Sequence, residues 1–372
     1  MNPIEKLHSL GQSIWYDNIE RRLLSKGDLA LMIEQDRIRG ITSNPSIFKN
    51  AIANSSDYDE ELIPLAKIGK TKEEIYEKLA ITDIQAACDL FKSLYEKTRG
   101  GDGYVSLEVN PYLANDGEAT IEDARRLWGL VDRKNLMIKI PATVNGLKSI
   151  SETIASGINV NVTLIFSIKR YEGVIDAYIS GLEKRLSLGK PINGIASVAS
   201  FFVSRIDSAV DSRLDSIING GEYKQENAMK LKGKIAVANA KLAFDIHKTL
   251  FNDVRFIEIS AKGARIQRAL WASTSTKNPD YSDTKYVDEL IGPNTINTIP
   301  PKTLLAFQDH GTANLTLEED LLGAKKAFED LKELGISISE VTDELEVKGV
   351  QAFASDYSLL LESIEKRRLG LV

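Results

Sequence analysis

The stretch Leu136-Met137-Ile138-Lys139-Ile140-Pro141 is an apolar run with a single charged residue inside it. It is followed by apolar residues at helical spacing over 145–155, and then by a second apolar run, Asn159–Phe166. A strand, a helix and a second strand in this order are typical of a crossover connection between parallel strands. We therefore expect residues 136–166 to contain one unit of an α/β fold.

The same alternation continues along the whole chain and predicts its architecture. Several of the expected strands are apolar on both faces, as in a sheet covered by helices. Eight strand–helix units in 372 residues favour a (β/α)8 barrel with helical insertions. The alternative is an open doubly wound sheet, which is weakened because no Gly-x-Gly-x-x-Gly turn follows the first strand. The expected strands are Ser13–Asp17, Gly40–Asn44, Tyr104–Val109, Leu136–Ala142, Asn159–Phe166, Gly194–Phe202, Arg268–Thr274 and Thr295–Ile299.

Two helical segments extend beyond this alternation. Residues 51–98 form an all-helical insertion between the second and third strands, and residues 343–367 form a helix near the end of the chain. No Gly/Ser-rich or Pro-rich linker separates parts of the sequence. We therefore expect residues 1–372 to form a single domain.

Composition excludes several classes of function. Hydrophobic residues make up 43% of the chain and charged residues 27%, and the formal charge is −6, so no general basic field is present for nucleic acid. No run reaches the roughly 18 apolar residues of a membrane span, and the first residues lack a secretory pattern. We expect a cytoplasmic protein. A single cysteine, Cys88, and three widely spaced histidines predict neither a disulfide nor a metal site.

Lys139 is the first candidate for chemistry. An unpartnered ammonium group on a buried strand costs several kcal/mol, unless it gives up its proton and becomes a nucleophilic amine. Such a lysine indicates carbonyl chemistry through a Schiff base. The alternative is a lysine on an exposed strand face, or one whose ammonium group reaches water beyond an apolar stem.

Polar residues at the other strand ends are expected to face the same pocket, at the carboxyl end of the barrel. Each has an ordinary alternative: Asp17 as a helix cap, Asn44 as a turn residue, Thr163 as a strand residue, and Arg205 and Lys277 as surface cations. A buried Glu108 is harder to dismiss, because an unpaired carboxylate is costly there. The expected set is Asp17, Asn44, Glu108, Lys139, Asn161, Thr163, Ser200, Arg205, Ser273 and Lys277.

Strand parity tests part of this set. Asn161 and Thr163 are two residues apart and therefore lie on one face of their strand, which we expect to continue to Ile165. Val160, Val162 and Leu164 are expected on the opposite face. This arrangement predicts a polar inner face and an apolar outer face beneath the helices.

Five motifs follow one another along the chain: Gly40-Ile41-Thr42-Ser43-Asn44-Pro45-Ser46-Ile47-Phe48, Val105-Ser106-Leu107-Glu108-Val109, Ile138-Lys139-Ile140-Pro141-Ala142-Thr143, Asn161-Val162-Thr163-Leu164-Ile165-Phe166-Ser167 and Ser200-Phe201-Phe202-Val203-Ser204-Arg205. In this order they resemble the motifs of the transaldolases, and the resemblance covers most of the chain. The length and the stretch 270–279 resemble the longer bacterial and plant-type branch.

The resemblance implies a role for each residue. Lys139 forms an imine with a ketose phosphate, Asp17 is the base at the C4 hydroxyl, Glu108 moves protons through a water, and Thr163 holds that water. Asn44 and Asn161 hydrogen-bond the substrate, Ser273 also binds it, and Ser200 and Arg205 bind the distal phosphate. Shorter members carry an arginine after the seventh strand, a position that Lys277 takes here, with Arg268 as the alternative.

The implied reaction moves a dihydroxyacetone unit from sedoheptulose 7-phosphate or fructose 6-phosphate to glyceraldehyde 3-phosphate or erythrose 4-phosphate. No cofactor is needed, and a monomer or homodimer is expected. The main rival is an aldolase that releases free dihydroxyacetone from the same imine. A rival of another class is a barrel that only binds sugar phosphates, against which the set of Asp17, Glu108 and Lys139 argues.

Overall fold

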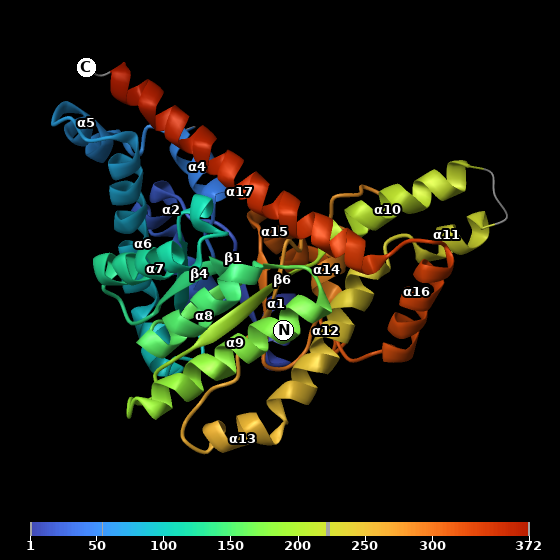
Figure 1. Cartoon of the computed structure of the whole chain (residues 1–372). Helices are drawn as coiled ribbons and strands as arrows, with labels where there is room; N and C mark the ends of the chain where they lie inside the picture. The colour runs from blue at the N-terminus through green and yellow to red at the C-terminus, as the bar shows by residue number, and fades with distance from the viewer. Residues whose placement is uncertain (1, 54, 221–223, 371–372) are drawn as a thin grey trace.

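The computed structural model (Figure 1) describes residues 2–53, 55–220 and 224–370, and the pairing of its strands forms a closed barrel. Its eight strands are all parallel, and each pairs with its neighbours in chain order until β8 closes on β1. The (β/α)8 barrel is therefore confirmed, and the open doubly wound sheet is wrong. The strands are β1 (Gln12–Tyr16), β2 (Gly40–Ile41), β3 (Tyr104–Glu108), β4 (Leu136–Pro141), β5 (Val160–Ile165), β6 (Ser197–Phe202), β7 (Arg268–Ala272) and β8 (Thr295–Ile299).

Helices connect the strands and cover the outside of the barrel. None of the described helices is long and apolar enough to cross a membrane. They are α1 (Pro3–Ser9), α2 (Arg21–Ser25), α3 (Asp28–Glu34), α4 (Pro45–Ala53), α5 (Asp59–Lys67), α6 (Lys72–Lys97), the 3-10 turn η1 (Pro111–Leu113), α7 (Gly117–Val131), α8 (Val144–Ser156), α9 (Ile168–Ser187), α10 (Ser204–Asn219), α11 (Gln225–Leu231), α12 (Ile235–Phe251), α13 (Val254–Ser260), α14 (Lys285–Asp288), α15 (Pro301–His310), α16 (Leu321–Glu333) and α17 (Ile338–Leu369).

The two extra helical segments flank the carboxyl end of the barrel. The segment expected over 51–98 contains the end of α4 and all of α5 and α6. Helix α17 is longer than the expected 343–367, because Ser337 caps it by accepting a hydrogen bond from the Glu340 amide. In Figure 1, α17 is the long red helix that runs across the molecule above the barrel, and it packs against α4, α6 and α10.

Polar side chains gather inside the barrel at both of its ends. At the amino-terminal end, Arg268 forms an ion pair with Asp102 at 2.9 Å and donates to Ser13 Oγ and the Thr295 carbonyl. Trp15 Nε1 donates to the same Asp102 carboxylate at 3.2 Å. Arg268 therefore belongs to the end of the barrel associated with stability, and its assignment as an alternative phosphate ligand is wrong.

Strand β5 contains an irregularity near its carboxyl end. Val162 pairs with Ala199 but Ile165 pairs with Phe201, so β5 holds one extra residue, and Leu164 adopts a left-handed φ of 60°. Because the extra residue reverses the parity, Ile165 lies on the face of Val162. The expectation that Ile165 shares the face of Asn161 and Thr163 is wrong for this reason.

Gly40 provides a test of the packing inside the barrel. A Cβ atom added to Gly40 would lie 2.6 Å from Cδ2 of the buried Trp15 indole, so we expect Gly40→Ala to lower the free energy of unfolding by about 1–3 kcal/mol. Gly129→Ala in α7 is the control, because nothing lies within 4 Å of its added Cβ, and alanine favours a helix by up to about 1 kcal/mol. Urea unfolding measures both, and equal stability of the two variants would contradict this packing.

Candidate active site

Lys139 lies on β4 inside the carboxyl end of the barrel and is 3% exposed. Its Nζ donates to the Ser43 carbonyl at 3.1 Å and lies 3.6 Å from Glu108 Oε2. On the side of α17, the Phe353 ring centroid is 5.7 Å from the same nitrogen. The interpretation of Lys139 as an exposed strand residue is therefore wrong, and its amine is enclosed by a carbonyl, a carboxylate and an aromatic ring.

Glu108 is the carboxylate partner of this lysine. It is the last residue of β3 and pairs with Lys139 in the register of β3 and β4, so both side chains enter the barrel at one level. Its side chain is 5% exposed, and burial raises its pKa to about 7, although the charge of Lys139 opposes the rise. A carboxyl group with this pKa exchanges protons near neutral pH.

Asp17 follows β1 and lies at the same end of the barrel. Its carboxylate accepts a 2.7 Å hydrogen bond from Thr42 Oγ1, which also contacts Thr298 Oγ1 at 2.5 Å. The helix that follows begins after Glu20, so Asp17 contacts Thr42, directly after β2, and does not cap that helix. Burial raises the pKa of Asp17, against the opposing charge of Lys139. A carboxyl group held in this way can accept a proton from a substrate hydroxyl.

Asn161 on β5 is fixed from both sides. Its Nδ2 donates to Ser106 Oγ at 3.0 Å, and Ser200 Oγ donates to its Oδ1 at 2.7 Å. In the register of β4 and β5, Asn161 pairs with Lys139. Ser200 therefore lies inside the barrel beside Asn161, and these hydrogen bonds determine which side of the amide faces each serine.

Thr163 and Asn44 are two further residues of the expected set. Thr163 is fully buried, and its Oγ1 has no hydrogen-bond partner among the described residues. Glu108 Oε2 is likewise without a hydrogen bond in the described chain. Asn44 follows β2, and its Oδ1 accepts from the Ile47 amide at the start of α4, as the turn interpretation expected.

Two cations lie near Asp17. Arg205 at the start of α10 holds its guanidinium 5.2 Å from the Phe202 ring centroid, and burial lowers its pKa. Lys277 lies in the loop after β7, and desolvation followed by repulsion from Arg205 lowers its pKa. Within the described residues, neither cation forms an ion pair with a carboxylate. Two neighbouring cations without such partners are suited to an anion with several oxygens.

Ser273 directly follows β7 and contacts Ser204 at the start of α10. It has a left-handed φ of 55°, its carbonyl accepts from the Ser204 amide at 3.0 Å, and the two hydroxyl groups are 3.0 Å apart. Strained backbone of this kind is concentrated at functional sites. The structure therefore places Ser273 at the same end of the barrel as Arg205 and fixes the start of the helix that carries Arg205.

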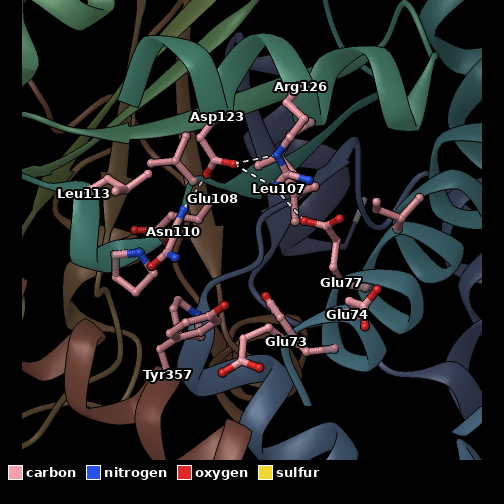
Figure 2. Close-up of a pocket in the computed structure, with 17 residues that line it drawn as sticks. Glu73, Glu74, Glu77, Leu107, Glu108, Asn110, Leu113, Asp123, Arg126 and Tyr357 are labelled. Carbon is pink, nitrogen blue, oxygen red and sulfur yellow. Dashed lines mark hydrogen bonds and ion pairs between the residues drawn. The ribbon is translucent and has the colours of Figure 1, made fainter. Parts of the chain in front are cut away.

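A cavity of about 270 Å³ lies beside β3 and is lined by α6, η1, α7 and α17 (Figure 2). Arg126 forms ion pairs there with Glu77 at 2.6 Å and with Asp123 at 2.7 Å. Glu108 contributes to its wall, whereas Lys139 does not. Sequence reasoning missed this cavity, because its lining comes from helices whose polar residues look like an ordinary solvated surface.

Other residues of the site were also missed. Ser106 and Thr42 lie in motifs that were recognised, and the signal that would have found them is strand parity, because Ser106 is two residues before Glu108 and Thr42 is two residues before Asn44. Phe353 carried no such signal, because it lies on a helix far from Lys139 in the sequence. The described residues contain no group of three His, Cys, Asp or Glu side chains that could hold a metal ion.

Comparison with known proteins agrees with this geometry. The family model for transaldolase/fructose-6-phosphate aldolase matches residues 14–364. The transaldolase of Trichodesmium erythraeum is 46% identical over 370 residues, which cover 98% of this chain and 97% of the relative. The transaldolase of Acidothermus cellulolyticus is 47% identical over 366 residues, covering 98% and 96%. The chain belongs to the transaldolase/fructose-6-phosphate aldolase family.

Proposed function

We propose that the protein is a transaldolase of the non-oxidative pentose phosphate pathway. It transfers a dihydroxyacetone unit from sedoheptulose 7-phosphate to glyceraldehyde 3-phosphate, giving erythrose 4-phosphate and fructose 6-phosphate. The observation that carries this proposal is the buried contact between Lys139 and Glu108 at 3.6 Å, at the catalytic end of the barrel.

Imine formation begins when Lys139 passes its ammonium proton to Glu108. Burial raises the pKa of Glu108 to about 7, which makes its carboxylate a stronger base than an ordinary one, and the neutral amine then attacks the C2 carbonyl of the ketose. The C2 oxygen takes up protons and leaves as water, and a protonated imine remains on Lys139. We assign Glu108 and Thr163 to the two ends of one water molecule, because their buried oxygens have no hydrogen-bond partner within the described residues.

Carbon–carbon cleavage then uses Asp17. The carboxylate accepts the proton of the C4 hydroxyl, the C3–C4 bond breaks, and its electron pair moves into the protonated imine. An aldose phosphate leaves, and a three-carbon enamine remains on Lys139. The imine nitrogen is the electron sink, so the reaction requires no organic cofactor or metal.

Transfer is the reverse of cleavage with a second aldehyde. The enamine carbon attacks the acceptor aldehyde, whose oxygen takes the proton back from Asp17, and water then hydrolyses the new imine. Asn44 and Asn161 hydrogen-bond substrate hydroxyls and the enamine. Arg205, Lys277 and the hydroxyls of Ser200 and Ser273 bind the distal phosphate. Since Ser200 donates to Asn161 in the free protein, phosphate binding by Ser200 requires its hydroxyl to change partner.

The proposal extends to the setting of the enzyme. Its partners are sugar phosphates rather than nucleic acids or membranes, and it acts in the cytoplasm as a monomer or homodimer. The net charge of −6 supports sugar phosphates rather than nucleic acids as partners, because the chain has no general basic field. The mechanism needs only a local basic feature, the pair of Arg205 and Lys277.

Borohydride reduction tests the nucleophile. Treatment with fructose 6-phosphate and borohydride is expected to add one reduced three-carbon unit to the peptide that contains Lys139, because reduction fixes the imine as a stable amine. Mass spectrometry of a digest locates the adduct. Lys148→Arg, an exposed lysine next to Glu118, is the control and should label like the wild type. An adduct on another lysine, or none, refutes the mechanism.

Glu108→Gln tests the proton relay. The variant should remain folded by circular dichroism and lose activity by about 100- to 10,000-fold, the usual contribution of a general acid–base group. In the wild type, kcat/KM should fall as the pH drops through about 7, because the carboxylate form of Glu108 is then lost. This inflection should be absent from Glu108→Gln. The exposed Glu118→Gln is the control, and wild-type turnover in Glu108→Gln removes Glu108 from the relay.

Arg205→Ala tests phosphate recognition. Loss of a charged hydrogen-bonding group should raise KM for fructose 6-phosphate by about 10- to 100-fold. Lys277→Ala should have a smaller effect, because Lys277 is exposed. Arg125→Ala, which removes an exposed arginine on α7, controls for net charge. Steady-state kinetics with fructose and fructose 6-phosphate separate the contributions, and an unchanged KM in Arg205→Ala contradicts the assignment.

A further inference from the structure

Helix α17 presents one buried stripe to the carboxyl end of the barrel. Gly349, Phe353 and Tyr357 are spaced four residues apart and therefore lie on one face of the helix. An added Cβ on Gly349 would be 3.0 Å from Leu164 Cδ2, at the irregularity in β5. Phe353 lies over the Lys139 amine at 5.7 Å. The stripe therefore crosses the barrel mouth from β5 to β4 and beyond.

Aromatic contacts continue this stripe over the next turn. The Tyr357 ring packs against Tyr76 of α6 at 5.4 Å and against Tyr112 of η1 at 5.5 Å, both edge to face. Tyr357 also lines the cavity beside β3 (Figure 2). Tyr357 therefore holds the helix against η1 and α6, one turn beyond the residue that covers Lys139.

Ion pairs hold α17 along its length. Glu346 pairs with Arg170 of α9 at 3.0 Å, and Asp356 pairs with Lys49 and hydrogen-bonds Ser46, both on α4. Further along, Arg367 pairs with Asp59 of α5. Because these contacts lie on both sides of Phe353, they hold its ring at a defined place over the amine.

We infer that Phe353 determines whether the three-carbon unit on Lys139 is transferred to an aldehyde or released to water. This inference rests on the proposed transaldolase function. It deepens that function, because the same enamine is the intermediate of both outcomes. Phe353 is the apolar group that covers the reacting nitrogen, so it will contact the three-carbon unit attached there.

The two outcomes differ in which molecule reacts first with the enamine carbon, the acceptor aldehyde or water. In transfer, the enamine carbon forms a bond to the acceptor aldehyde. In release, the same carbon takes a proton from water, a water oxygen adds to C2 of the resulting imine, and the C2–N bond breaks to give dihydroxyacetone and the free Lys139 amine. Release therefore needs water and a proton to reach the enamine before the acceptor does.

Phe353 restricts that access. Phe353 is 5% exposed, and Lys139 beneath it is 3% exposed. The amine donates to the Ser43 carbonyl and lies beside the Glu108 carboxylate, whereas the residue that faces it from α17 is apolar. Truncation of Phe353 replaces an aromatic ring with space that can admit a second, unguided water.

The test compares Phe353→Ala and Phe353→Leu with the wild type. Free dihydroxyacetone is measured from fructose 6-phosphate alone, and transfer is measured with glyceraldehyde 3-phosphate as the acceptor. Phe353→Ala should raise the ratio of release to transfer by about tenfold or more, a change of about 1.4 kcal/mol in relative barrier. Phe353→Leu, which keeps an apolar side chain and the fold, should raise it less but measurably.

Leu360→Ala is the matched control, because Leu360 is fully buried on the same helix two turns beyond Phe353. Its ratio should remain that of the wild type. An equal rise in Leu360→Ala, or an unchanged ratio in both Phe353 variants, overturns the inference. Borohydride labelling distinguishes the two levels of the argument: a labelled Lys139 with an unchanged ratio overturns only the role of Phe353, whereas an unlabelled Lys139 in the wild type overturns the proposed function.

Discussion

The contact between Lys139 and Glu108 is the constraint on which the rest of the site depends. Removing a charged amine and a carboxylate from water costs several kcal/mol per ion, and their mutual attraction repays this only in good geometry. Here the pair is 3.6 Å apart and both side chains are at most 5% exposed. Burial outweighs the attraction of Lys139 and raises the pKa of Glu108 to about 7, so this carboxyl group gains and loses a proton near neutral pH.

The closed barrel supplies the geometry that this pair requires. Parallel pairing places Glu108, Lys139 and Asn161 at one level on three successive strands. The amino-terminal end of the same barrel holds a partly buried charge pair, Asp102 and Arg268, which also forms hydrogen bonds with Trp15 and Ser13. The two ends thus differ: at one end Arg268 joins β7 to β1 and β8 through hydrogen bonds, and at the other the amine of Lys139 lies beside Glu108.

The sequence predicted all eight strands because each is a short apolar run between helical segments, and the closed topology follows from their number and parallel order. It also predicted that Asp17, Glu108 and Asn161 lie at the same end of the barrel as Lys139, since the carboxyl ends of parallel strands meet at one edge, but it missed Ser106 and Thr42. It misplaced Ile165, because the extra residue in β5 has no signature in composition. It also kept Arg268 as the alternative to Lys277 for binding phosphate, because sequence alone does not show at which end of the barrel the side chain lies.

The sequence by itself determined the family and the barrel, because these follow from local motifs and from the alternation of strands and helices. It also singled out Lys139 as the candidate amine, from the cost of burying an ammonium group on a strand. Only the tertiary structure decided what surrounds that amine. Phe353 reaches Lys139 from a helix more than 200 residues further along the chain, and Ser43 supplies a carbonyl from another strand end. Residues so far apart in the sequence come into contact only through the packing of α17 over the closed barrel, and no local sequence pattern predicts that packing.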